Sequence, residues 1–253
     1  MRKKMSICLL LTGMIGAFAK DPPSNPHAQH GCAGLPTAAQ LTSFLNSVAP
    51  VATESTAATG PIGGLFNGTR MWAAVVNRYG ELCAVAASRT DPTQVWPGSL
   101  AIAKSKAYTA NAFSLDTLAL STARLYTFTQ PGHSLWSLGQ SNLFNTGFLA
   151  APDDGSDGEG RIPGGLIFFG GGLGLYSNGK IIGGLGISGD TSCADHEVAK
   201  RVRTAATLNP PGGSSVDDIV YSPPDAASVF AHPVCLNTWR NGTFIGTEKT
   251  ATY

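Results

Sequence analysis

The stretch GGLIFFGGGLGLYSNGKIIGGLGIS, residues 164–188, constrains the fold of this chain more than any other segment. Asn178 and Gly179 separate two apolar runs, and Asn-Gly in that position is typical of the two-residue type I′ turn that joins antiparallel strands. The three glycines Gly170, Gly171 and Gly172 favour a bulge or a close approach to the backbone, including by a flat ligand lying on the strand. We therefore expect a β-hairpin here.

A second hairpin and several helices are expected elsewhere. Residues 70–88, RMWAAVVNRYGELCAVAAS, hold two β-rich runs around Asn77 to Gly80, and Gly80 suits the left-handed position of the turn. Apolar residues at helical spacing follow Thr37, a suitable N-cap, in TAAQLTSFLNSVA. Further helices are expected over 99–114 and from about Ser192 to Ala206, and a shorter one is compatible with 116–128. This order predicts an α+β sandwich with an antiparallel sheet.

The first nineteen residues have the organisation of a secretory signal peptide. A basic start precedes an apolar run from Met5 to Gly16, and Ala17-Phe-Ala19 matches the small-x-small cleavage rule. The apolar run is too short to span a bilayer. We therefore expect cleavage after Ala19, no membrane insertion afterwards, and a periplasmic or secreted location in a bacterium.

The low charge content limits the partner classes. Only 13% of the residues are charged, against about 25% in an average soluble domain. The formal net charge of the full chain is +1. Loss of the signal peptide would lower this charge by three units, because it removes three basic and no acidic residues. Nucleic acids and anionic membranes need a basic patch, so neither is expected as a partner. With 43% hydrophobic residues, the chain should bury apolar surface in a homo-oligomer.

Three segments together resemble the GlcG/HbpS family of haem-binding proteins, whose fold also occurs as the C-terminal domain of PduO-type cobalamin adenosyltransferases. The segments are MWAAVVNRYGELCAVA, SLAIAKSKAYTANAF and GGLIFFGGGLGLYSNGKIIGGLGISGDTSCADHEVAKRVR. Their most specific features are the helix around Lys106 to Ala110, the run Phe169 to Gly172 and the pattern Gly184-x-Gly-x-Ser-Gly189. The resemblance covers residues 37–206 and points to a longer, secreted, cysteine-containing branch.

The resemblance implies a five-stranded antiparallel sheet flanked by helices, an oligomer, and haem binding with variable ligands. It divides the remaining chain into an irregular arm over 20–36, a GlcG/HbpS-like domain over 37–208, and a C-terminal extension over 209–253 packed on that domain. An acidic insert near 153–159 departs from the family pattern. The resemblance does not settle a reaction, because one fold can carry several functions.

Four cysteines follow the expected signal peptide, and an even number in an oxidising compartment favours two disulfides. They are Cys32, Cys83, Cys193 and Cys235. Cys193 stands three residues before His196, and His232 stands three residues before Cys235, so these four could also form a tetrahedral zinc site. We favour a Cys193–Cys235 disulfide that fastens the extension to the last helix, which leaves Cys32 to pair with Cys83.

Three histidines are candidate haem ligands. His196 lies at the start of a helix, where the dipole disfavours imidazolium, so its neutral ring could bind iron, and a Cys193–Cys235 bridge would bring His232 near it as a second metal ligand. The alternative for His196 is a surface histidine. His133 follows Pro131-Gly132 in a loop beside Trp136 and could flank a porphyrin, or it is simply an exposed loop residue.

Lys106 is a further candidate, because it lies in the helix that carries the family resemblance. A lysine there could neutralise a haem propionate as a point charge, or it could be a solvated side chain. Haem is therefore the expected cofactor, with Gly170 to Gly172 as the strand against which a flat molecule would lie.

These features favour an exported haem-binding protein, which senses, stores or otherwise handles haem, over an enzyme. Neither a Ser-His-Asp triad nor a paired-carboxylate constellation is recognisable in the sequence. One alternative is an enzyme of unknown substrate that uses the same pocket, with Lys106 or His196 as acid or base. Another is a structural subunit of a cell-envelope assembly.

Overall fold

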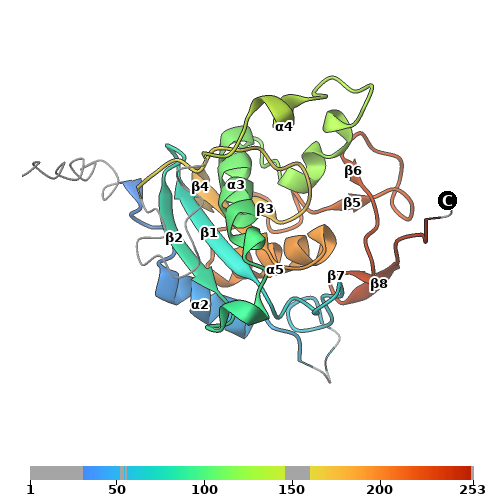
Figure 1. Ribbon diagram of the computed structural model, residues 1–253, viewed down its shortest axis with the longest axis horizontal. Helices are drawn as coiled ribbons and strands as arrows, with labels where there is room; N and C mark the ends of the chain where they lie inside the picture. Colours follow the sequence, from blue (N-terminus) through green and yellow to red (C-terminus); the bar gives the residue numbers. More distant parts are fainter. Residues whose placement is uncertain (1–30, 52–53, 55, 146–159, 252–253) are drawn as a thin grey trace, which may run out of the picture.

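A computed structural model describes residues 31–51, 54, 56–145 and 160–251 of the chain (Figure 1). The expected signal peptide, most of the arm, and the acidic insert near 153–159 lie outside the described residues. Within the described ranges, no helix combines the length and apolarity needed to cross a membrane.

The central sheet consists of two antiparallel hairpins that pair side by side. The first is β1 (Trp72–Asn77) with β2 (Leu82–Ala87), and the second is β3 (Gly172–Ser177) with β4 (Lys180–Ser188). Strands β1 and β4 run antiparallel along their lengths and give the strand order β2-β1-β4-β3. Two segments about 100 residues apart in the sequence thus form one sheet.

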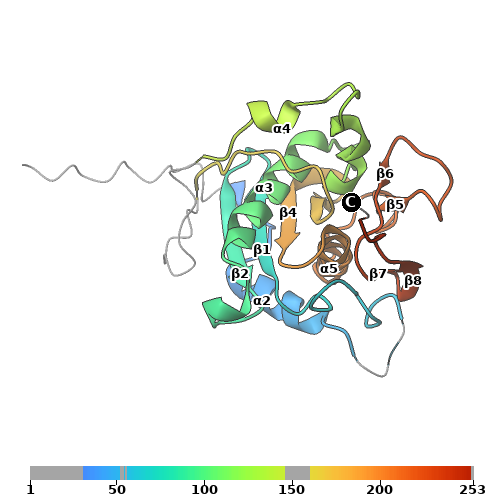
Figure 2. The same ribbon diagram turned by 45° about the vertical axis from the view of Figure 1, so that its right-hand side comes forward.

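Helices cover both faces of this sheet (Figures 1 and 2). Helix α3 (Gly98–Phe113) packs on one face, while α2 (Ala38–Ser47) and α5 (Ser192–Ala205) pack on the other. Side chains alternate between the faces: Ala73 and Val75 of β1 belong to the core shared with α2 and α5, and Ala74 belongs to the core shared with α3. Every residue of β1 is buried because neither face of the strand meets solvent.

Local sequence signals explain the turns and the first helix. Thr37 caps α2 and forms a capping box with Gln40, as expected from its position. The β3–β4 turn holds Asn178 at φ 49° and Gly179 at φ 75°, the left-handed pair that a type I′ turn requires. Gly80 closes the β1–β2 turn at φ 83°. Both predicted hairpins are therefore confirmed.

Glycines on β4 allow α3 to approach the sheet closely. A Cβ placed on Gly184 would lie 2.2 Å from the carbonyl oxygen of Ala107, and one on Gly186 would lie 2.0 Å from that of Ala103. Any side chain at either position would collide with the helix backbone. The Gly-x-Gly pattern therefore sets the distance between α3 and the sheet.

The expected five-stranded sheet is wrong, because the main sheet has four strands. The apolar run before β3 does not join it: the N–H of Ile167 donates to the Thr109 hydroxyl of α3, and the carbonyl of Phe169 accepts from Thr122. The helix considered for 116–128 is also absent, since this segment forms the short 3-10 turns η2 (Thr122–Leu125) and η3 (Thr127–Thr129). Around Ile167 and Phe169, side-chain hydroxyls thus bind the backbone groups that a neighbouring strand would otherwise have bound.

The C-terminal extension lies beside α5 at one end of the molecule (Figure 2). It contains the parallel pair β5 (Val220–Tyr221) and β6 (Ala231–His232) and the antiparallel pair β7 (Thr238–Arg240) and β8 (Thr243–Gly246). Both favoured disulfides are present, Cys193–Cys235 and Cys32–Cys83. The first joins the start of α5 to the extension, and the second joins the arm to β2.

Candidate functional site

All the predicted haem-site residues except His133 lie around the start of α5. The Thr191 side chain caps this helix, which begins at Ser192. The Asp190 carboxylate accepts hydrogen bonds from backbone N–H groups of the 61–70 loop, and its own N–H donates to Asp195. These contacts fix the first turn of the helix against the loop.

Lys106 and Asp195 form a buried ion pair next to this turn. Nζ of Lys106 lies 2.6 Å from Oδ2 of Asp195, and neither side chain is more than 2% exposed. The ammonium also donates to the carbonyl of Ile187 and lies 4.9 Å from the centroid of the Phe169 ring. Burial lowers the pKa of Lys106 and raises the pKa of Asp195 to about 6, although their mutual attraction opposes both shifts. Lys106 therefore neutralises a carboxylate of the protein itself and is not a solvated side chain.

His196 lies in the second turn of α5 and is completely buried. Its Nε2 is 3.4 Å from Oδ1 of Asp218, but neither ring nitrogen has a hydrogen-bond partner among the described residues. Burial alone would raise the pKa of Asp218, but the contact with His196 and the charge of Lys200 outweigh it and hold that pKa below its usual range. The alternative of a surface histidine at position 196 is therefore wrong.

His232 reaches the same turn from β6. Its Nδ1 lies 2.7 Å from the carbonyl oxygen of Pro233, so Nδ1 carries the proton and donates. Its Nε2 accepts from the N–H of Gly170 at 3.4 Å and lies 3.3 Å from the Ser192 hydroxyl. The Tyr126 ring packs 5.0 Å away. Burial, only partly opposed by the bond to Pro233, lowers the pKa of His232 to about 4.

This pKa predicts that His232 stays neutral well below the usual range of an imidazole. The folded value of about 4 lies below the ordinary imidazole value of 6.5, so the unfolded chain takes up the proton first as the pH falls. The contribution of His232 to stability is complete above about pH 6.5 and is lost between there and about pH 4. NMR titration, with the signal assigned by His232→Gln, should give a midpoint near pH 4, and a midpoint at 6.5 or above contradicts the burial argument. The titration is preferable to a melting curve, because the raised pKa of Asp195 acts on stability in the opposite direction.

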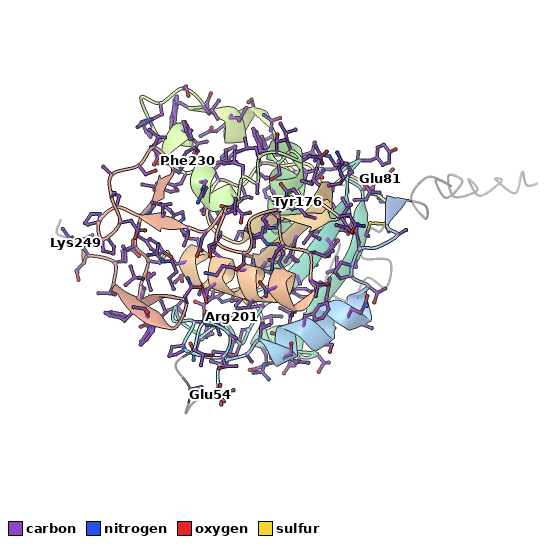
Figure 3. All side chains as sticks on the ribbon, turned by 180° about the vertical axis from the view of Figure 1, so that it is seen from behind. Glu54, Glu81, Tyr176, Arg201, Phe230 and Lys249 are labelled. Atoms are coloured by element: carbon purple, nitrogen blue, oxygen red, sulfur yellow. A yellow bond between two sulfur atoms is a disulfide. The ribbon has the colours of Figure 1, made fainter. Side chains whose placement is uncertain are left out.

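A row of buried ion pairs joins α5 to the extension. Arg203 donates through both terminal nitrogens to Asp217, at 2.7 and 2.6 Å, and neither side chain is exposed. Lys200 lies 2.8 Å from Asp218 and 2.9 Å from Glu197. Figure 3 shows α5 from behind, with Arg201 labelled beside it; this residue binds Glu197 and the carbonyl of Gly60. The carboxylates of the extension thus pair with Lys200 and Arg203 of α5 and offset the cost of burying these two charges.

The glycine run is packed against this cluster. A Cβ on Gly170 would lie 2.2 Å from the carbonyl oxygen of Ser192, and one on Gly171 would lie 2.8 Å from Nζ of Lys106. The N–H of Gly172 donates to the Thr122 hydroxyl. The expected close approach to the backbone is therefore present, and the approaching groups belong to the protein itself.

His133 lies on a different part of the molecule, in what we call the outer layer, residues 126–145 and 160–169. It is exposed, as are its neighbour Trp136 (50%) and Leu143 (75%). The layer covers α3, since the hydroxyl of Ser105 donates to the carbonyl of Gly164. Figure 1 shows this layer above α3, around the short helix α4 (Leu138–Ser141).

The structure brings together His196, His232, Lys106, the glycine run and the Cys193–Cys235 disulfide. Sequence reasoning missed the acidic residues of the extension, above all Asp217 and Asp218. Their signal is two adjacent carboxylates before the apolar run IVY, in a segment with little other pattern. In the structure Lys200 binds Asp218 and Arg203 binds Asp217, whereas Arg201 binds Glu197 of α5 itself.

Comparison with known proteins gives one family match. The family model described as "Haem degrading protein HbpS-like" matches residues 64–203. No curated protein matches the chain.

Several solved structures align with the chain over much of its length. The Klebsiella pneumoniae protein ORFY is 24% identical, with a TM-score of 0.40 and coverage of 55% of this chain and 76% of that one. A PduOC:haem complex is 22% identical, with a TM-score of 0.44 and coverage of 72% and 93%. A crystal structure of HbpS is 19% identical, with a TM-score of 0.38 and coverage of 67% and 89%.

Proposed function

Because this chain belongs to the HbpS-like family of haem-degrading proteins, we propose that it binds haem. The family match is the observation that carries this proposal, since residues 64–203 include the whole sheet, α3 and nearly all of α5. Bound haem would supply an iron centre for ligand or redox chemistry. The residues of the protein would hold the haem, shield it and provide an axial ligand.

The two buried histidines do not fit a group of this size as they are packed. An imidazole that binds haem iron has to present a lone pair at a surface or in a cavity. His196 is completely buried and His232 is 3% exposed, with its Nε2 directed at Gly170 and Ser192. For either ring to reach haem, the extension would have to leave α5 and break the ion pairs that hold it there.

The outer layer fits haem better. His133 is the one exposed histidine among the described residues, and Trp136, Leu143 and Ile162 offer exposed apolar surface in the same layer. Backbone hydrogen bonds support this layer: the N–H of Gly165 donates to the carbonyl of Leu143 at 3.0 Å. A porphyrin needs apolar contact over its faces and one nitrogen ligand, so we place His133 first among the three histidines as axial ligand.

Tryptophan fluorescence tests both the binding and its place. Haem quenches nearby tryptophans by energy transfer, so titration of the wild type should give saturable quenching. Trp136→Phe should remove more of the quenchable signal than Trp96→Phe, its matched control, because Trp96 is similarly exposed (47% against 50%) but lies outside the outer layer. Quenching that never saturates contradicts haem binding, and equal effects of the two variants contradict binding at the outer layer.

We also propose that the protein acts after export and as a homo-oligomer. Two disulfides support export, since such bonds persist in oxidising compartments. Exposed apolar residues support self-association. Leu115 and Leu118 lie just after α3, and Tyr79 lies in the β1–β2 turn, which contacts the end of α3 through Arg78 and Asn111. We therefore propose a haem-handling protein that acts in the periplasm or outside the cell.

A further inference from the structure

The Cys193–Cys235 disulfide lies against a third group that binds soft metals. The two sulfur atoms and one ring nitrogen of His232 lie within 4.8 Å of one another, and all three residues are buried. We propose that reduction of this disulfide converts the spot into a Zn²⁺ site in which Cys193, Cys235 and His232 are the ligands. This inference is independent of haem binding.

The orientation of His232 is that of a metal ligand. Its Nδ1–H donates to the carbonyl of Pro233, which fixes the ring with Nε2 near Ser192 and the two sulfur atoms. The long hydrogen bond from the N–H of Gly170 to Nε2, at 3.4 Å, would be exchanged for the metal. Metal-binding histidines characteristically donate their second nitrogen to a carbonyl or carboxylate in this way.

The position of Cys193 favours the thiolate that zinc needs. Cys193 is the second residue of α5, where the helix dipole stabilises a negative sulfur. A dithiol reductant would attack Cys235, the more exposed partner at 8% against 1%, and Cys193 would leave as a thiolate. The second thiolate of the reductant then displaces Cys235 and forms the cyclic disulfide of the reductant. Two electrons reach the protein sulfurs, and binding of Zn²⁺ to the two thiols releases two protons.

Ser192 completes the surroundings of the site. Its hydroxyl lies 3.3 Å from Nε2 of His232 and 3.3 Å from Sγ of Cys235. Two thiolates and one imidazole leave a fourth tetrahedral position, which this hydroxyl or water can take. The ion would join α5 to the extension as the disulfide does, so the extension stays fastened under reducing conditions. His196 is outside the ligand set, because only the ligand atoms of Cys193, His232 and Cys235 lie within 4.8 Å of one another among the described residues.

The test measures Zn²⁺ binding in the full chain with Cys8, Cys32 and Cys83 replaced by serine, so that only the two relevant sulfurs remain. The protein is reduced with dithiothreitol, freed of it under argon, and dialysed against Zn²⁺. We expect one Zn²⁺ per chain in the reduced protein and none in the oxidised protein. His232→Ala should weaken binding by at least about 100-fold, because loss of an outer-shell partner alone costs about 10–100-fold. Glu248→Ala, which removes an exposed acidic residue of the extension outside the ligand group, should bind as the parent does.

Co²⁺ provides a second readout that does not depend on a variant. The reduced parent should give the thiolate charge-transfer band and the intense visible bands of tetrahedral Co²⁺, both abolished by Zn²⁺. Circular dichroism monitors the fold throughout, and a reduced chain that unfolds should refold when Zn²⁺ is added. Absence of Zn²⁺ binding after reduction, equal binding by folded His232→Ala, or an unfolded chain that Zn²⁺ does not restore would overturn the proposal.

Discussion

Replacing Asp217 with alanine should lower the free energy of unfolding by about 3–5 kcal/mol, the usual cost of leaving one partner of a buried ion pair alone. Both terminal nitrogens of Arg203 donate to Asp217, and both side chains are 0% exposed. Without the carboxylate, the guanidinium keeps only the carbonyls of Gly174 and Ser214 as partners. Urea unfolding of the wild type and the variant measures the difference.

Asp225→Ala is the matched control for this experiment. Asp225 also forms a two-nitrogen pair with an arginine of the extension, Arg240, but the two side chains are 23% and 27% exposed. Water can solvate the Arg240 guanidinium in the variant, so the free energy of unfolding should fall by clearly less than in Asp217→Ala. Equal losses in the two variants would show that burial of the Arg203–Asp217 pair is not what makes it important.

Lys106→Met should cost a similar amount, about 3–5 kcal/mol at neutral pH, because it leaves Asp195 buried without its cation. The loss should shrink in acid. Lys106 opposes the raised pKa of Asp195, so without it that pKa rises further above 6, and the carboxyl is neutral in the folded variant at pH 5. The destabilisation therefore grows as the pH rises above about 6, where the carboxyl ionises in the folded wild type before it does so in the folded variant.

The double variant Lys106→Met/Asp195→Asn separates charge from packing. The amide is neutral, and its oxygen can still accept the N–H of Asp190, so most of the lost stability should return. Urea unfolding at pH 5 and pH 8 on the three proteins measures both effects. A single variant whose loss is the same at both pH values, or a double variant less stable than the single one, contradicts the ion-pair account.

The elements governed by local chemistry could be predicted from the sequence. Asn178-Gly179 specified its turn because few dipeptides tolerate two left-handed residues, and Thr37 specified the start of α2 through its hydroxyl. The pairing of Cys193 with Cys235 also followed, because the extension had no other evident attachment. Each of these inferences needs only residues close in sequence or a count of cysteines.

The features that depend on long-range competition could not be predicted. The run before β3 has the composition of a strand, but hydroxyls of Thr109 and Thr122 take its backbone groups, and the sheet ends at four strands. His196 was expected at the start of a helix and lies in the second turn of α5, yet its burial depends on how Asp217 and Asp218 return to α5 from the extension. No periodic pattern in the sequence of the extension indicated which of its residues would lie against α5.

The central claim, that this chain binds haem with His133 as axial ligand, is tested most directly by the Soret absorption of haem during titration. The wild type should give a saturable Soret shift, His133→Ala a different maximum and weaker binding, and folded His196→Ala and His232→Ala the wild-type maximum. A wild-type spectrum equal to the sum of free haem and free protein would contradict haem binding. A Soret maximum that moves in His196→Ala or His232→Ala, and not in His133→Ala, would contradict the assignment of the ligand.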